Sequence, residues 1–384
     1  MLRLGHSSLK PIVALVPLLA LAQPLGLRQN GGRWEHDFFG TAPVARRLRI
    51  IAHGPVTLHA GTTQGSISYS VRLSVRARTA AEARRVMERF QVRPEKLGDT
   101  TVITTPDGPF ITTVVVKTPR LDFAGIKTTD GAIEAGGVDG ILIAETGAGE
   151  MHIDRIRGDC RLITGGGDVE VGTIGGALRC NSGAGKITVG TVKGECAMET
   201  QGGDILATEI KGPARAQTGG GGIHIIRAGS SVAAGTVGGP IVVDHAAGIV
   251  TARNMAGPVQ VGAAGGVQCE SGSGGIRVTN IAGPMRVSTS LGNIMATLFG
   301  AKLADSFLAT GNGDITVMIP SNVGVDIRAQ NDLADNMKRI LCQFPTVSVR
   351  RQGRQIVAEG KVNGGGPLLQ ISATMGTIFI NRMQ

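Results

Sequence analysis

The chain has 384 residues, of which 59 are glycine, 42% are hydrophobic and only 3% are aromatic. Glycine is far above its usual share of about 7%, but no Gly-X-Y period is present, which excludes collagen, and the apolar content excludes a disordered chain. The net charge of +10 comes without the aromatic side chains on which nucleic-acid bases stack, so nucleic acid is not an expected partner.

The N-terminus is typical of a secretory signal peptide. Arg3 and Lys10 flank the start, the apolar run PIVALVPLLALA follows, and Ala20 and Ala22 provide small residues near its end. The apolar core of about 11 residues is too short to span a bilayer, which needs roughly 20. We expect cleavage near Ala22, export to the periplasm, the cell surface or the medium, and no transmembrane segment in the mature chain. After export, the basic charge favours anionic glycans, lipid headgroups or an envelope protein as partners.

Residues 46–120 predict a small α+β cap. Strands over 46–78 are expected to form a hairpin that turns at Gly54-Pro55. The segment TAAEARRVMERF (79–90) predicts an amphipathic helix, with Thr79 as N-cap and Glu82 completing a capping box. Strands at 101–118 then complete the cap.

Beyond the cap, the glycines recur every 18 residues. When Gly140 and its equivalents count as zero, positions 6, 9 and 11 hold a hydroxyl residue (asparagine in one coil, Asn254), a glycine and an apolar residue in about eleven repeats. The starting glycines are Gly140, Gly158, Gly176, Gly194 and Gly212. Position 6 includes Thr146, Thr164, Ser182 and Thr200, position 9 includes Gly149, Gly167, Gly185 and Gly203, and position 11 includes Met151, Val169, Ile187 and Ile205.

Each repeat predicts one coil of a parallel β-solenoid. Positions 2 and 4, and then 11, 13 and 16, are apolar or small, an alternation typical of two strands with one buried face. Glycines at positions 7 to 9, such as Gly165 to Gly167, are expected to permit positive φ at the corner between the strands. Stacking at about 4.8 Å gives a rod about 50 Å long. We expect right-handed coils, because parallel crossovers are nearly always right-handed. A left-handed hexapeptide helix fails because positions 2, 8 and 14 do not match, and no phosphate-loop motif is present.

The repeated T-x-x-G-x-I-x-V core, as in TQGGDILA (200–207) and TGNGDITV (310–317), resembles the bacterial "putative adhesin" family of β-strand repeats. That family is a toast-rack-like β-solenoid domain of unknown function. The resemblance covers about residues 35–384, including RRLRIIAHGPVTLHAG near the start and QISATMGTIFI near the end. It implies a bacterial envelope or surface protein and brings no catalytic residues. The nearly uncharged middle coils (213–266) depart from the family pattern.

Most polar residues of the repeat have a structural interpretation. The position-6 hydroxyls share the parity of the buried positions, so an inward ladder of hydrogen bonds is expected. Cys160 and Cys180 lie in adjacent coils but are offset by two residues, about 8 Å apart, which exceeds the roughly 7 Å limit for a disulfide. Cys196 and Cys269 also fall at buried positions, and Cys342 lies in the C-terminal cap. We expect free thiols.

No cofactor or metal site is expected. The position-10 carboxylates are interrupted by Lys186, which argues against calcium. His152 and His224 point outward four coils apart, and His53 and His59 flank the expected hairpin. The outward carboxylates are scattered over the coils: Glu145, Glu170, Glu199 and Glu270. A polysaccharide-degrading β-helix enzyme would need them clustered, and Trp34 and Tyr69, which could stack on sugars, lie outside the solenoid.

The one candidate binding feature is a row of arginines at outward position 3: Arg161, Arg179, Arg215 and Arg286. Its planar guanidinium groups suit carboxylate or phosphate, although Glu145 and Glu199 could partly neutralise them. We predict a non-catalytic, adhesin-like structural protein of the envelope that binds an anionic polymer or a protein partner. An envelope-stress signalling partner and a polysaccharide-degrading enzyme remain alternatives. The expected organisation is a signal peptide (1–22), a linker (23–45), the N-terminal cap (46–120), the solenoid (121–320) and a C-terminal cap with a closing coil (321–384), in which Asn331 opens a short helix.

Overall fold

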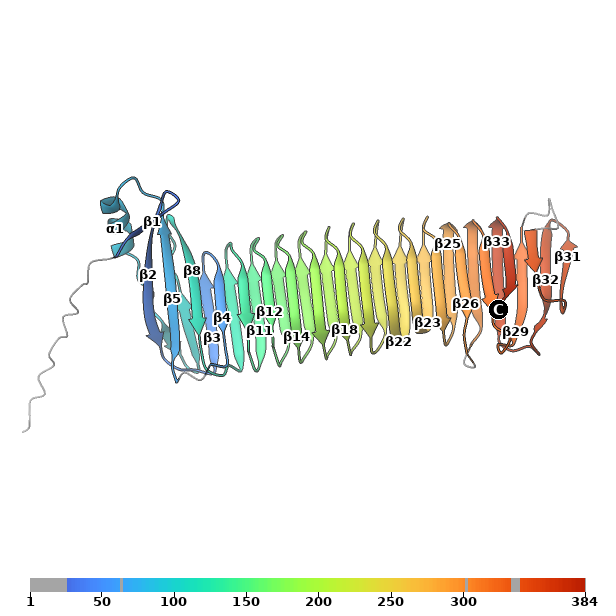
Figure 1. Ribbon diagram of the computed structural model, residues 1–384, viewed down its shortest axis with the longest axis horizontal. Coiled ribbons are helices and arrows are strands. Elements are labelled where there is room, and N and C mark those ends of the chain that lie inside the picture. Colours follow the sequence, from blue (N-terminus) through green and yellow to red (C-terminus); the bar gives the residue numbers. More distant parts are fainter. Residues whose placement is uncertain (1–25, 63–64, 301–302, 333–338, 384) are drawn as a thin grey trace, which may run out of the picture.

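The computed structural model is a straight rod built from two parallel β-sheets that face each other (Figure 1). It describes residues 26–62, 65–300, 303–332 and 339–383; the expected signal peptide lies outside these. Each coil gives one strand to each sheet, and neighbouring coils pair 18 residues apart, as in Ile187↔Ile205 and Cys196↔Ala214. The predicted β-solenoid with 18-residue coils is confirmed.

The first sheet contains the strand that opens each regular coil. In order along the rod its strands are β6 (Glu95–Leu97), β7 (Thr100–Thr104), β3 (Arg47–Ala52), β9 (Phe123–Thr128), β11 (Ile141–Thr146), β13 (Cys160–Thr164), β15 (Leu178–Ser182), β17 (Cys196–Thr200), β19 (Ala214–Thr218), β21 (Val232–Thr236), β25 (Met285–Leu291), β27 (Ser306–Asn312), β33 (Leu368–Met375), β29 (Val325–Asn331), β32 (Gln355–Val362) and β31 (Val347–Gln352).

The second sheet contains the strand that follows the glycine corner. Its strands, in order along the rod, are β1 (Arg28–Asn30), β2 (Arg33–Ala42), β5 (Ile67–Val75), β8 (Phe110–Lys117), β4 (Val56–His59), β10 (Ile133–Gly136), β12 (Met151–Asp154), β14 (Val169–Ile174), β16 (Ile187–Val192), β18 (Ile205–Ile210), β20 (Ile223–Ala228), β24 (Ile276–Ile281), β26 (Ile294–Leu298), β28 (Ile315–Ile319), β34 (Ile378–Arg382) and β30 (Ile340–Cys342). Two long strands, β22 (Ile241–Asn254) and β23 (Val259–Ser271), run through both sheets.

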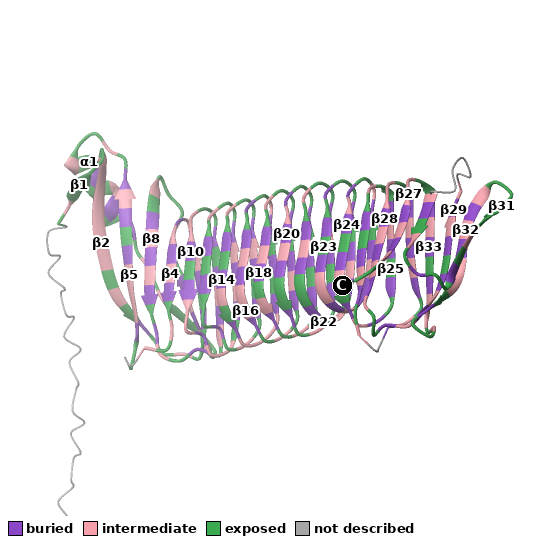
Figure 2. Cartoon of the chain, turned by 45° about the vertical axis from the view of Figure 1, so that its right-hand side comes forward, coloured by how far each residue is buried: buried purple, intermediate pink, exposed green. Residues whose placement is uncertain are grey.

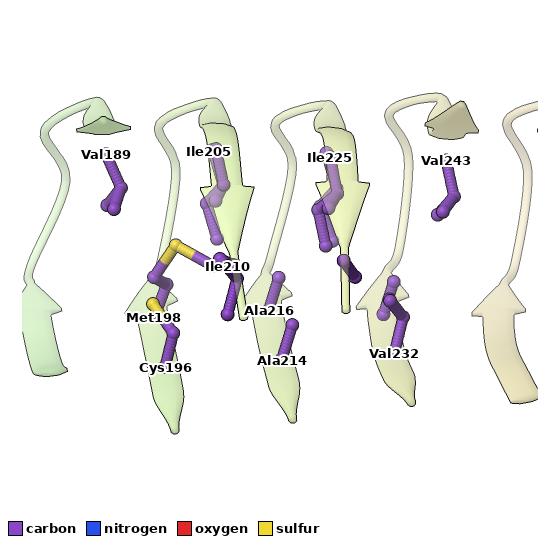
Figure 3. Packing of buried hydrophobic residues seen from close by; sticks show 14 of the residues in the cluster. Val189, Cys196, Met198, Ile205, Ile210, Ala214, Ala216, Ile225, Val232 and Val243 are labelled. Carbon is purple, nitrogen blue, oxygen red and sulfur yellow. The ribbon is translucent and has the colours of Figure 1, made fainter. Parts of the chain in front are cut away.

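The core is one continuous apolar column between the sheets, and the strands alternate buried and outward residues along the rod (Figure 2). In the middle coils, Cys196 and Met198 of the first sheet point toward the same interior as Ile205 and Ile210 of the second (Figure 3). All four are at most 1% exposed. Full burial of a side chain of this size stabilises the fold by about 1.5–3 kcal/mol, and a coil can obtain that burial only from its own two strands and the neighbouring coils.

A ladder of hydroxyls lines one edge of the core, as predicted. Thr164 Oγ1 donates to the carbonyl oxygen of Gly149 in the preceding coil at 2.9 Å and accepts from the amide of Gly167 in its own coil at 3.1 Å. Thr200 does the same with Gly185 (2.9 Å) and Gly203 (3.3 Å). Thr164 and Thr200 therefore each tie the glycine corner of their coil to the corner before it, and each hydroxyl is used both as donor and as acceptor.

The corner glycines have a different role from the one expected. Gly149, Gly167 and Gly185 do not have positive φ; among the corner glycines at this repeat position, positive φ occurs in end coils, at Gly131 (φ 115°) and Gly313 (φ 152°). Gly167 is required because a Cβ atom there would lie 2.1 Å from the carbonyl oxygen of Gly149. At this position the backbones of successive corners stack too closely for any side chain. The expectation of positive φ is thus wrong for the regular coils.

At the N-terminal end the coils do not follow chain order. β3 and β4 do not pair with each other; each lies between two parallel neighbours, β3 between β7 and β9 and β4 between β8 and β10. The predicted hairpin across Gly54-Pro55 is therefore wrong, and these residues form a coil of the solenoid. Residues expected in a linker form β1 and β2, because β2 pairs antiparallel with β5 at the edge of the second sheet.

The predicted cap helix is confirmed as α1 (Ala80–Glu88). Thr79 Oγ1 accepts from the amide of Glu82 at 3.2 Å, while the Glu82 carboxylate accepts from the amide of Arg78 at 3.0 Å. Met87 on α1 is fully buried. Phe90, just after the helix, contacts Phe38 and Phe110, with ring centroids 5.2 and 5.3 Å apart, so aromatic packing closes this end of the rod.

At the C-terminal end, too, the coils do not follow chain order. β33 lies between β27 and β29, and β34 lies between β28 and β30. The last strands of the described chain are thereby inserted between earlier coils. Asn331 ends β29, is fully buried and donates from Nδ2 to the carbonyl oxygen of Gly376 at 2.9 Å. The short helix expected to begin at Asn331 falls mostly on residues 333–338, which lie outside the described residues; the described parts of that segment include the end of β29 and the start of β30.

Candidate functional site: an arginine row on the first sheet

Repeat position 3 forms an outward row across the first sheet, and we name Arg161, Arg179 and Arg215 on this row the arginine strip. Arg161 on β13 is directly opposite Arg179 on β15, and Ala197 on β17 separates Arg179 from Arg215 on β19. All three arginines are exposed. Their positions follow from the strand parity, since their neighbours at positions 2 and 4 must face the core.

The strip has outlying members at both ends of the rod. Arg286, the fourth predicted residue, is separated from Arg215 by Ala233, Thr251 and Gln268, so it lies four coils away. Two further arginines, which the 18-residue period does not predict, also fall on this row. Arg49 aligns with it through Gly125 and Ile143, and Arg328 aligns with it through Gln370 and Phe307. Their coils are stacked out of chain order, so the 18-residue period could not reveal them.

The expected neutralising carboxylates do not pair with the strip. Glu145 makes its ion pair with Lys127 at 3.6 Å. Within the described residues, Arg161 and Arg179 have no carboxylate within 4.0 Å, and Arg215 Nη2 donates to the Gln217 side chain at 3.0 Å. Two arginines placed directly opposite destabilise the sheet by some tenths of a kcal/mol. An anion that bridges them would remove this repulsion.

A shallow hollow of about 240 Å³ lies beside Arg161 and Arg179. Its apolar lining includes Ile141 and Ile143, and its acidic lining includes Asp159 and Glu195. One oxygen of Asp159 is already hydrogen-bonded, because Oδ1 accepts from the amide of Ala177 at 2.9 Å. The hollow therefore offers an apolar floor, two unpaired guanidinium groups and a mixed-charge rim, which suits an extended polar chain better than a small ion.

The cysteines are free, and four of them are buried. Burial raises the pKa of Cys160, Cys196 and Cys269 to about 12 and raises that of Cys180 further. Leu178, not Cys180, is opposite Cys160, which confirms the predicted two-residue offset. These thiols remain protonated at neutral pH and behave as small apolar core residues.

His152 and His224 form separate surface pairs. His152 contacts Glu170 at 3.2 Å, and His224 contacts Asp244 at 2.9 Å. Over the described part of the chain, no group of three or more histidine, cysteine or acidic residues has an arrangement that could hold a metal ion. The described helix is also too short to cross a membrane.

These features define a class of protein: a capped, two-sheet β-solenoid rod with an arginine row on one outer face. Comparison with protein-family profiles and with curated proteins returns no match. Among solved structures, one similar chain is described as a "putative adhesin" from Bacteroides fragilis, with a TM-score of 0.34, 15% identity, and coverage of 64% of this chain and 97% of that one. Another is described as a "putative cell adhesion protein" from Clostridium sporogenes, with a TM-score of 0.17, 8% identity, and coverage of 91% and 98%.

Proposed function

We propose that the protein is an exported, non-catalytic, adhesin-like rod of the bacterial cell envelope that binds an anionic surface polymer along the arginine strip. The observation that carries the proposal is the register of Arg161 and Arg179. The two guanidinium groups are held on paired strands about 4.8 Å apart, with no carboxylate in ion-pair range among the described residues. A repeating polymer can present anionic groups to several such positions at once.

The outward carboxylates support a binding role over a catalytic one. Glu145 pairs with Lys127, Glu170 with His152 and Glu270 with Arg253. Glycoside hydrolysis needs two carboxyl groups that flank one bond, one of them as a proton donor. Carboxylates that each contact a different basic side chain, on different coils, fit surface pairs.

The rigidity of the scaffold favours this role. Each corner is tied to the preceding one by a hydroxyl and by backbone hydrogen bonds, such as that from the Gly165 amide to the Thr146 carbonyl at 3.3 Å. A preorganised row loses little conformational entropy when a polymer binds. Multivalent contact can then give useful affinity even though each exposed charge contributes little.

The test is the triple variant Arg161→Ala, Arg179→Ala, Arg215→Ala, titrated with polygalacturonate by calorimetry at low and at physiological salt. We expect about tenfold weaker binding at low salt, a smaller salt dependence because fewer ions are released, and unchanged or slightly raised thermal stability because a like-charge contact is removed.

A control variant with the same change in net charge away from the first sheet distinguishes local recognition from overall charge: Lys186→Ala, Arg227→Ala, Arg277→Ala. It should bind within about twofold of the wild type. Equal losses in both variants would mean that net charge alone attracts the polymer, and an unchanged strip variant would remove the strip from the binding site.

A further inference from the structure

A second basic feature lies at the other corner of the coils, where each coil passes from the second sheet back to the first. Here a groove of about 630 Å³ runs along the rod, and we name it the corner groove. Its charged lining residues are Arg120, Arg155, Arg157, Lys193 and Asp139. Four cationic side chains face one carboxylate of the lining, and the Asp154 carboxylate beside the lining pairs with Arg155 Nε at 3.3 Å. The formal excess is therefore two positive charges. The arginine strip, by contrast, is flanked by Asp159 and Glu195.

Asp139 organises the centre of the groove. Its side chain is only 15% exposed, and its two oxygens receive different arginines: Arg120 Nε at 2.7 Å and Arg157 Nη1 at 2.8 Å. Each guanidinium is thereby fixed in position by one edge. The remaining donors of both groups stay available, because a guanidinium carries five N–H bonds. The two side chains themselves are 69% and 76% exposed.

The groove exists because a column of basic residues, one from each successive coil, is interrupted by a glycine. Arg157, Gly175 and Lys193 occupy equivalent corner positions in successive coils, and each amide donates to the preceding coil, at 2.9, 2.7 and 3.0 Å respectively. The missing side chain at Gly175 opens space between two cations that are two coils, or about 10 Å, apart. Nothing larger fits at Gly175, since a Cβ there would lie 2.3 Å from the Arg157 carbonyl oxygen.

Arg155 adds a fourth cation in an unusual way. Its φ of 55° lies in the left-handed region, which costs conformational free energy for any residue other than glycine. Its guanidinium extends over the neighbouring coil, with Nη2 4.0 Å from where a Cβ of Gly136 would be. A backbone outlier that places a charge at a groove is a reason to look for function there.

We propose that the corner groove is a second binding site, which takes a short segment of an anionic oligosaccharide that carries carboxylate or sulfate groups. The groove spans five successive coils, from the loop at Ala60 to Lys193, or about 19 Å. That length fits an oligomer and exceeds any single inorganic anion. The free guanidinium edges of Arg120 and Arg157 match a carboxylate or sulfate by paired hydrogen bonds, and Lys193 contacts a second anionic group about 10 Å further along.

This site is independent of the arginine strip. It lies at the corner and not on the outer face of the first sheet, and it requires a discrete ligand of limited length. A polymer bound along the strip would be recognised by repetition, whereas the groove would recognise one segment with a defined stoichiometry.

The test is calorimetric titration of the full chain with tetragalacturonate and, separately, with a heparin-derived tetrasaccharide. We expect one site per chain for the oligosaccharide whose charged group fits. Arg157→Ala and Lys193→Ala should each weaken binding about tenfold, the loss typical of one charge-assisted contact. Arg155→Gly should also weaken binding while keeping or raising the midpoint of thermal unfolding, because glycine relieves the left-handed backbone.

The matched control is Lys211→Ala, which removes a lysine from the same column one coil beyond the groove. It should bind within about twofold of the wild type, as should the arginine-strip triple variant. If the arginine-strip variant also lost binding of the tetrasaccharide, the two sites would not be independent, and this proposal would be refuted. Equal loss in Lys211→Ala, no binding of either tetrasaccharide, or displacement by inorganic phosphate at equal concentration would also refute it.

Discussion

The stacking of the glycine corners gives a sharp prediction, because adjacent glycines in one run differ completely in their surroundings. A Cβ at Gly167 would lie 2.1 Å from the Gly149 carbonyl oxygen, whereas a Cβ at Gly166 would meet nothing within 4 Å. Ordinary contact begins at 3.4 Å, so Gly167→Ala forces the two corners apart by about 1.3 Å. That shift strains the hydrogen bond from Thr164 Oγ1 to the same carbonyl, now 2.9 Å.

The magnitude follows from two contributions. Overpacking in a rigid interior costs about 1–3 kcal/mol, and loss of two hydrogen bonds at the corner costs about 1 kcal/mol each. Gly167→Ala should therefore lower the free energy of unfolding by about 3–5 kcal/mol. Gly166→Ala should be neutral or stabilise by up to about 1 kcal/mol, since alanine restricts the unfolded chain.

Urea unfolding of both variants, followed by circular dichroism, measures the difference. Hydrogen exchange at the amides of β11 and β13, which lead into the two corners, localises the effect, because a repeat protein responds mainly through neighbouring coils. Equal unfolding midpoints for Gly166→Ala and Gly167→Ala would refute the explanation of the glycine corner by close backbone stacking.

Three further predictions concern the core. Thr200→Val should cost about 1–3 kcal/mol in urea unfolding, because the carbonyl and amide it serves are left unsatisfied, while Thr188→Val on the outer face should change stability by less than about 0.5 kcal/mol. Ile205→Asp should abolish cooperative unfolding by calorimetry, since the buried charge has no partner. Cys196 should react with a thiol reagent only after denaturation, whereas the half-buried Cys342 should react in the native protein. The Cys196 thiol has a pKa near 9 in the unfolded chain and about 12 in the folded protein. Its contribution to stability is therefore fully present below pH 9 and is lost as the pH rises toward 12. Between these two pH values, the Cys196→Ala variant should lose less stability with rising pH than the wild type does.

The regular coils could be predicted from the sequence because every level of the pattern agrees. Strand parity places Ile205 and Cys196 in the core. The same parity directs the side chain of Thr200 toward the interior. The role of the corner glycines was misjudged, since sequence identifies a position that excludes side chains but does not distinguish positive φ from close contact between coils.

The ends and the corner groove could not be predicted for a different reason. Strand patterning does not specify a partner, so nothing in β3 or β33 indicates insertion between coils that are distant along the chain. Only the end of the corner groove at Ala60 depends on that stacking, because β4 lies beside β10. Arg120 meets Asp139 through the regular stacking of β9 on β11. Arg120 lies outside the predicted repeats, however, and the repeat pattern marks Gly175 as a corner without showing that it separates two cations.

The proposal that the rod binds an acidic polymer without cleaving it is tested most directly by affinity electrophoresis through a gel that contains polygalacturonate, followed by size analysis of the polymer. At low salt we expect the wild-type protein to be retarded, the arginine-strip triple variant to be retarded less, and the polymer length to stay unchanged after prolonged incubation. Unretarded migration of the wild-type protein would contradict the binding role, and shortened polymer would contradict the absence of catalysis.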